Sequence, residues 1–118
     1  MKLALFSDLH ANLPAFDACL NHARAQGATA IAVLGDLVGY GPHPSEVVER
    51  CRSLQQQGAT VLRGNHDLPP EAPATGATTW ADLGADWTFR QLDAQQRDWL
   101  AQLPLTATLE SIFLVHAS

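Results

Sequence analysis

Basic residues are scarce in this sequence, and they form no cluster. Lysine and arginine total 7 against 12 aspartates and glutamates, which gives a formal net charge of −5 at pH 7. Proteins that bind the phosphate backbone of nucleic acids carry basic patches, so specific nucleic-acid binding is not expected. An acidic protein that handled phosphate would need another source of positive charge, and a bound metal ion would supply it.

Cysteines are few, and long apolar runs are missing. The two cysteines, Cys19 and Cys51, fall within amphipathic helical patterns, so we expect buried thiols rather than a disulfide, as is typical of the cytoplasm. No stretch approaches the roughly 20 apolar residues of a membrane span. The opening "MKLALF" is followed closely by Asp8, so it does not resemble a secretory signal. We therefore expect a cytoplasmic protein with no membrane association.

Strand-like apolar runs alternate with helical patterns in the first half of the chain. Strands are predicted at 2–7, 29–35 and 59–64, with helices at 13–27 and 44–58 between them. Because strand–helix–strand connections are right-handed and join parallel strands, this order indicates an α/β fold with a parallel sheet. The length of 118 residues, 47% of them hydrophobic, suits a single domain over 1–118.

The second half of the chain has a less regular pattern. Residues 67–79 are rich in proline and predict a long loop, and 80–92 predicts a helix broken near Gly84. A second helix is predicted at 93–103 and a last strand at 111–116. The tryptophans of this half, Trp80, Trp87 and Trp99, are expected to pack in the core.

Polar side chains stand where each predicted strand ends. The ends read "SDLH", "GDLVGYGP", "RGNHD" and "VHAS", and they bring together Asp8, His10, Asp36, Asn65, His66 and His116. In an open α/β sheet, ligands bind outside the carboxyl ends of the strands, so we expect these side chains to converge on one edge. Taken singly, each motif is also typical of a turn, a helix cap or a structural histidine. Their joint occurrence at four strand ends favours a shared metal site.

The residue types and their spacing suit divalent cations. Asp8 and His10 are two residues apart, so on an extended chain they point to one face and can hold one ion. Gly35 permits a sharp turn after which the carboxylate of Asp36 can bridge two ions. Asn65 offers a neutral carbonyl oxygen, and His66 offers a proton.

These motifs resemble those of the calcineurin-like metallophosphoesterase superfamily, whose blocks run D-x-H, G-D, G-N-H-[DE], H and G-H-x-H. The phrases "SDLHANLPAF" and "GDLVGYGPHP" are similar to its small bacterial phosphodiesterase-like branch. The resemblance implies a β-sandwich flanked by helices, of which this chain carries mainly the first βαβαβ half. It also implies two divalent metal ions, with Mn²⁺ favoured over Fe, Zn²⁺, Ni²⁺ or Mg²⁺.

The same resemblance assigns roles to individual residues. Asp8 and His10 would bind the first metal, Asp36 would bridge both, and Asn65 and His116 would bind the second. The catalytic pair would be His66 and Asp67: the imidazole of His66 would stabilise charge or protonate the leaving oxygen, and Asp67 would orient that imidazole by a hydrogen bond. The implied reaction is hydrolysis of a small phosphodiester or phosphomonoester by a metal-bridging hydroxide.

One block of the superfamily, G-H-x-H, does not occur in these 118 residues. Without it, the chain supplies three protein ligands for each metal, counting Asp36 twice, so we expect weak hydrolysis by this chain. The missing half of the sandwich would also leave a sheet uncovered, which favours self-association. Two alternatives to an active phosphoesterase therefore stay open: an inactive metal-binding or interaction module, and an unstable product of a truncated reading frame.

Two further residues near the predicted edge are candidates for substrate binding. Asn12 and Arg63 could contact the substrate phosphate. The competing interpretations are a helix cap for Asn12 and a strand-end cation for Arg63. The pattern does not select among phosphate esters.

Overall fold

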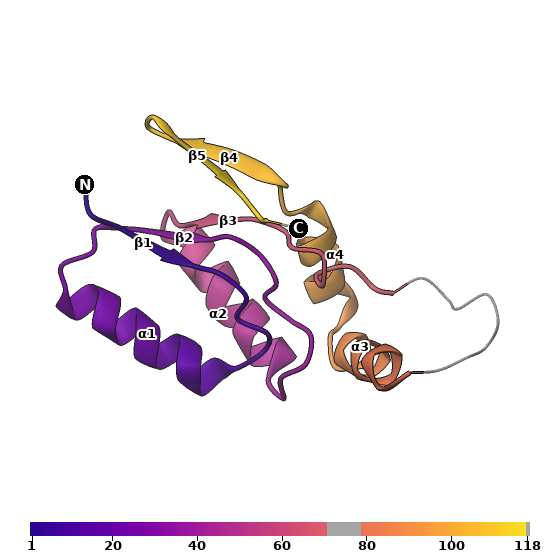
Figure 1. The fold of residues 1–118 in the computed structure, drawn as a ribbon. Coiled ribbons are helices and arrows are strands. Elements are labelled where there is room, and N and C mark those ends of the chain that lie inside the picture. The colour runs from indigo at the N-terminus through magenta and orange to yellow at the C-terminus, as the bar shows by residue number, and fades with distance from the viewer. Residues whose placement is uncertain (71–78, 118) are drawn as a thin grey trace.

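The computed structural model describes residues 1–70 and 79–117 as a mixed α/β fold (Figure 1). Parallel strands and helices alternate in the first half, as predicted. The strands are β1 (Leu3–Phe6), β2 (Ala30–Val33), β3 (Thr60–Val61), β4 (Thr106–Leu109) and β5 (Ile112–Val115). The helices are α1 (Leu13–Ala25), α2 (Pro44–Gln56), α3 (Trp80–Arg90) and α4 (Ala94–Gln102). None of the helices among the described residues has the length and apolar character that crossing a membrane requires.

The parallel sheet has the order β1-β2-β3, and its central strand, β2, is covered on both faces, whereas Leu5 of β1 is 54% exposed. Helices α1 and α2 pack against one face, and the β4–β5 hairpin lies over the other (Figure 1). Val33, at the end of β2, belongs to the core formed with the helices, whereas Ala32 packs with Leu114 of the hairpin. Burial on both faces explains why the β2 sequence is apolar throughout and does not alternate with polar residues.

Helix α1 buries a narrower stripe than the sequence predicts. Phe16 and Leu20 are buried, but Cys19 is exposed, so the expectation of two buried thiols was wrong for this residue. Successive helical residues are about 100° apart, and the core lies on the Leu20 side of the stripe, away from Cys19. Cys51 in α2 is buried as predicted, and its burial raises the pKa of the thiol.

Helix α3 continues through Gly84, so the predicted break is wrong. A reciprocal capping box between Thr79 and Asp82 starts the helix, and a single interior glycine costs only about 1 kcal/mol relative to alanine. The expected core role of two tryptophans is also wrong, because Trp80 is 89% exposed and Trp87 is 44% exposed. The predicted loop at 67–79 lies outside the described residues for 71–78.

The last strand belongs to a second sheet, whereas the sequence predicted that all four strands would end at one edge of the same sheet. Strand β5 pairs antiparallel with β4, which the sequence reading missed, and neither strand joins the parallel sheet. The turn between them places Glu110 at a φ of 54°. Glycine and asparagine are the residues that usually signal such a turn, so the hairpin had no recognisable marker.

The hairpin exposes large apolar side chains on its outer face. Phe113 and Val115 are exposed there, on the face away from the buried Leu114, and Phe113 leaves 65% of its area open to solvent. We expect Phe113→Ser to reduce concentration-dependent self-association, because an apolar strand with an open face favours contact between copies. Sedimentation velocity over a range of protein concentrations measures this. A substitution at Tyr40, which is exposed elsewhere in the fold, serves as the control, and an equal effect of both variants would contradict the prediction.

Candidate metal centre at the sheet edge

The segments that follow β1, β2, β3 and β5 meet at one end of the fold. Backbone bonds align the first two segments: the N–H of Asp8 donates to the carbonyl of Gly35 at 3.0 Å, and that of His10 to Asp36 at 2.9 Å. The β5 segment joins them through His116, whose Nδ1 lies 3.0 Å from the carbonyl oxygen of Leu34. The predicted convergence therefore occurs, although His116 arrives from the second sheet.

Asp36 lies at the centre of the cluster and is buried. Its Oδ2 lies 3.8 Å from Nε2 of His10 and 3.5 Å from Nε2 of His116. Asp8 lies on the His10 side, with Oδ1 3.7 Å from Nε2 of that histidine. One donor atom each from Asp8, Asp36 and His116 lie within 4.8 Å of one another. This spacing suits donors that share cations.

Backbone carbonyls fix the tautomer of both histidines. Nδ1 of His10 lies 3.2 Å from the carbonyl of Val38, and Nδ1 of His116 faces Leu34 in the same manner. A carbonyl only accepts, so each Nδ1 carries the hydrogen, and in the neutral imidazole Nε2 is then the acceptor atom on the Asp36 side. A lone pair facing carboxylate oxygens is unfavourable unless a proton or a cation lies between them. The donor set therefore fits a metal ion.

Asn65 completes the cluster on the His116 side. Its amide oxygen lies 3.0 Å from Nε2 of His116, an orientation that adds a third lone pair and suits a metal ligand. Turned by half a rotation, the amide nitrogen would instead donate to Oδ2 of Asp36 at 3.2 Å and to His116 at 3.0 Å. The mixture of carboxylate, imidazole and amide oxygen donors is compatible with several divalent ions and selects none of them.

Three candidate ligands have a left-handed backbone. The φ angles are 57° for Asp8, 44° for His10 and 56° for Asp36, a conformation that costs a residue other than glycine about 1–2 kcal/mol. The chain is thus not extended between Asp8 and His10, contrary to the premise of the sequence argument. Sharp local turns, held by the backbone bonds to Gly35 and Asp36, aim these side chains at the edge.

Asp67 links the segments that follow β2 and β3 through hydrogen bonds to their backbones. Its fully buried carboxylate accepts four backbone N–H groups, from Asp36 at 2.9 Å, Leu37 at 2.9 Å, Val38 at 3.3 Å and Gly64 at 2.7 Å. Burial raises the pKa of Asp67 to about 6, while the backbone donors act in the opposite direction. The expected hydrogen bond to the imidazole of His66 is therefore wrong, because both oxygens of Asp67 are committed to the backbone.

Two glycines allow the same segments to touch. A Cβ on Gly64 would lie 2.2 Å from the backbone nitrogen of Asp36, and a Cβ on Gly35 would lie 2.6 Å from the nitrogen of Gly64. The close approach also lets Oδ1 of Asp36 accept the N–H of His66 at 2.9 Å. The central carboxylate is thus oriented by the β3 segment while its second oxygen faces the histidines.

A family model, "Calcineurin-like phosphoesterase", matches residues 1–118. The chain belongs to this family. The uncharacterised protein MJ0912 of Methanocaldococcus jannaschii is 45% identical over 105 residues, which are 87% of this chain and 42% of that protein. The symmetrical bis(5'-nucleosyl)-tetraphosphatase of Delftia acidovorans is 32% identical over 127 residues, with 99% of this chain and 44% of that protein covered.

A metallophosphoesterase from Sphaerobacter thermophilus has a similar solved structure. The TM-score is 0.70 at 35% identity, covering 92% of this chain and 43% of that one. This likeness confirms the predicted α/β metallophosphoesterase fold. The chain spans less than half the length of each of these relatives.

Two candidate substrate contacts have structural partners within this calcineurin-like fold. Oδ1 of Asn12 accepts the N–H of Ala15 at 3.1 Å and caps α1. The guanidinium of Arg63 donates to the carbonyl of Ala101 in α4 at 2.8 Å. The cap and strand-end interpretations therefore account for both side chains, and a contact with substrate stays a prediction.

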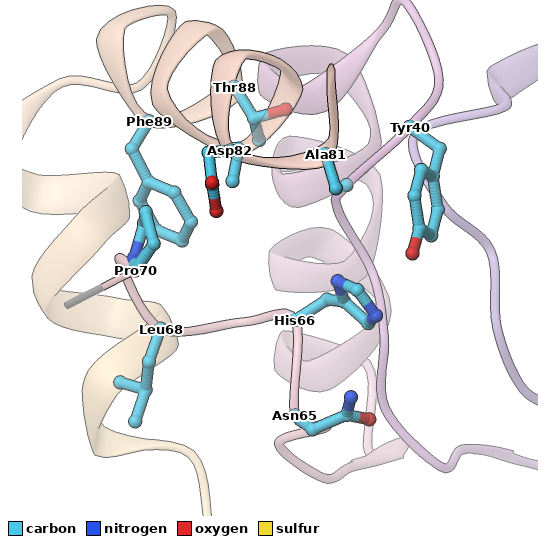
Figure 2. A pocket seen from close by; sticks show the side chains of 11 residues that line it. Tyr40, Asn65, His66, Leu68, Pro70, Ala81, Asp82, Thr88 and Phe89 are labelled. Atoms are coloured by element: carbon cyan, nitrogen blue, oxygen red, sulfur yellow. The ribbon is translucent and has the colours of Figure 1, made fainter. Parts of the chain in front are cut away.

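One part of the candidate site was not predicted from the sequence, a cavity bordered by His66 and Tyr40. Tyr40, from the β2 segment, has its ring centroid 4.9 Å from that of His10 and 5.0 Å from that of His66. Across the cavity lies α3, which contributes Ala81 and Asp82 (Figure 2). A signal existed for Tyr40, because an aromatic residue between two glycines follows closely on Asp36. The α3 residues that line the cavity, such as Ala81 and Asp82, carried no comparable signal.

Proposed function

We propose that this chain forms the metal- and phosphate-binding part of a phosphoesterase that hydrolyses small phosphate esters at two divalent cations. One observation carries the proposal: candidate ligand atoms of Asp8, Asp36 and His116 lie within 4.8 Å of one another, and Nδ1 of both His10 and His116 faces a backbone carbonyl. Such an arrangement is hard to explain by side-chain packing alone. It is what a family of metal-dependent phosphoesterases requires.

The proposed division of ligands follows the geometry around Asp36. Asp8 and His10 would hold one cation and Asn65 and His116 the other, with Asp36 shared between them. When bound, the two cations would neutralise charge on the phosphoryl oxygens and lower the pKa of an attacking water. Mn²⁺ is our proposed metal, and the donor types are also compatible with Fe, Zn²⁺, Ni²⁺ and Mg²⁺.

His66 is proposed as the proton donor to the leaving oxygen. Its backbone N–H is held by Asp36 at 2.9 Å, so the imidazole stays next to the shared carboxylate. The ring also lies 5.3 Å from that of His10, between the metal ligands and the cavity. A phosphate held by the cations would therefore have its leaving group on the His66 side.

The proposed substrates are small phosphate esters. The Delftia relative is named for the hydrolysis of bis(5'-nucleosyl) tetraphosphates, and other small phosphate esters fit the same chemistry. A cytoplasmic location is proposed as well, supported by the free thiols of Cys19 and Cys51.

The proposal predicts that Asp36→Asn will weaken Mn²⁺ binding. This change keeps an oxygen for the N–H of His66 and removes the charge that both cations would share. We expect the affinity to fall at least about 10- to 100-fold, the range found when groups around a metal are altered. Isothermal calorimetry or the paramagnetic resonance signal of free Mn²⁺ measures it.

The matched control is Asp86→Asn, the same change at an exposed position on α3. It should leave Mn²⁺ binding unchanged. Equal Mn²⁺ affinity for the wild-type chain and Asp36→Asn would overturn the proposed metal centre. Binding is the decisive readout because three protein ligands per metal predict weak turnover of bis-p-nitrophenyl phosphate.

A further inference from the structure

The cavity beside His66 has a volume of about 210 Å³ and lies between the sheet-edge segments and α3. Tyr40 and His66 form one side, and Ala81, Ala85 and Phe89 of α3 form the other. Figure 2 shows Ala81 and Asp82 facing His66 across the space. Because His66 also borders the candidate ligands, the cavity opens where a leaving group would emerge.

We propose that this cavity binds one planar, uncharged ring of the leaving group, an aryl group or a nucleobase, and that Tyr40 determines this specificity. The inference rests on the proposed phosphoesterase function and adds the substrate class. Size supports it, since a cavity of about 150 Å³ is known to hold benzene. The space available here suits one ring and is too small for two nucleosides.

Tyr40 has features that core packing does not explain. Its side chain is 71% exposed, and its φ of 67° is an unfavourable conformation for a bulky residue. The ring is nevertheless held beside two imidazoles, tilted by 54° to His66. An exposed aromatic ring at the mouth of a cavity offers a surface on which a planar group can stack.

Charge at the cavity disfavours a leaving group that carries a second phosphate. Asp82 is the charged wall residue, and its Oδ2 accepts the N–H of Thr79 at 3.1 Å and the hydroxyl at 2.9 Å. These bonds lower the pKa of Asp82, so it stays anionic at neutral pH. Among the described residues that line the cavity, no lysine or arginine is present to offset it.

Two phosphonates test the proposal without the complication of leaving-group reactivity. Phenylphosphonate and methylphosphonate present the same anionic group to the metals, and they differ in the ring. We expect the Mn²⁺-loaded chain at pH 8.5 to bind phenylphosphonate about 5- to 150-fold more tightly, the range of stacking on one aromatic side chain. With diamagnetic Mg²⁺ in place of Mn²⁺, the methyl NMR signals of Ala81 and Ala85 should shift with phenylphosphonate alone.

Three variants separate the pocket from the metal centre. Tyr40→Phe should keep the preference for the ring, and Tyr40→Ala should lose most of it. Ala85→Leu fills the cavity from α3, so it should abolish the preference and leave methylphosphonate binding unchanged. A phenyl-to-methyl ratio near one in the wild type, or one that neither Tyr40→Ala nor Ala85→Leu alters, overturns the pocket while the metal centre stands. Failure of both phosphonates to bind overturns the proposed function and this inference together.

Discussion

Replacing Gly64 with alanine is expected to destabilise the fold by about 3–5 kcal/mol, near the upper end for single substitutions. The added methyl would lie 2.2 Å from the backbone nitrogen of Asp36 and 2.2 Å from its Oδ1. Backbone atoms cannot rotate away as a flexible side chain can, so the β2 and β3 segments must separate. Urea denaturation followed by circular dichroism measures the loss.

Gly84 provides a matched control for the same chemical change. It lies inside α3, and a Cβ there would meet no atom within 4 Å. Gly84→Ala should therefore stabilise the protein by up to about 1 kcal/mol, since alanine favours helices over glycine. If Gly64→Ala unfolded at the same urea concentration as the wild type, the two segments would not approach as closely as the 2.2 Å distances require.

Removal of the Asp67 carboxylate should have a comparable effect. In Asp67→Ala, the backbone N–H groups of Asp36, Leu37, Val38 and Gly64 would lose their acceptor inside the protein. Each buried donor left unpaired costs about 1–3 kcal/mol, with partial relief where water enters. We expect a total loss of about 3–5 kcal/mol in the free energy of unfolding, measured in the same urea titration.

The exposed Asp86 tests whether charge alone explains such a loss. It pairs with Arg90 on the surface of α3, so Asp86→Ala should change stability by no more than about 0.5 kcal/mol. Asp67→Asn should fall between wild type and Asp67→Ala, because one oxygen remains as an acceptor. Equal stability of Asp67→Ala and Asp86→Ala would refute the role assigned to the buried carboxylate.

The sequence predicted the parallel half of the fold because its signals are local and strong. Apolar runs marked β1, β2 and β3, the last two bounded by glycines, and helical periodicity marked α1 and α2. The hairpin was harder, since Thr106–Leu109 is short and Glu110 occupies a turn position where glycine or asparagine is usual. Helix α3 was misread at Gly84 because propensity alone does not register the capping box that stabilises its start.

The candidate site also has a part that the sequence predicts and a part that only the structure shows. The metal-ligand residue types follow strand ends, so topology alone brings Asp8, Asp36 and Asn65 to one place. The partner of Asp67 could not be predicted, because its choice between an imidazole and four backbone donors depends on how closely two loops approach. Tyr40 also required the three-dimensional arrangement, since the cavity it borders is closed by a helix from the second half of the chain.

The four backbone bonds to Asp67 have a consequence for how fast an ion could come and go. They join the segments of Asp36 and Gly64 through the protein's own atoms, so the segments need no ion to find their relative positions. An arriving cation would not have to wait for a loop to order, and its rate of uptake would be set by the release of its own water molecules. Removing the ion with a chelator would then leave the sheet edge folded and ready to bind again.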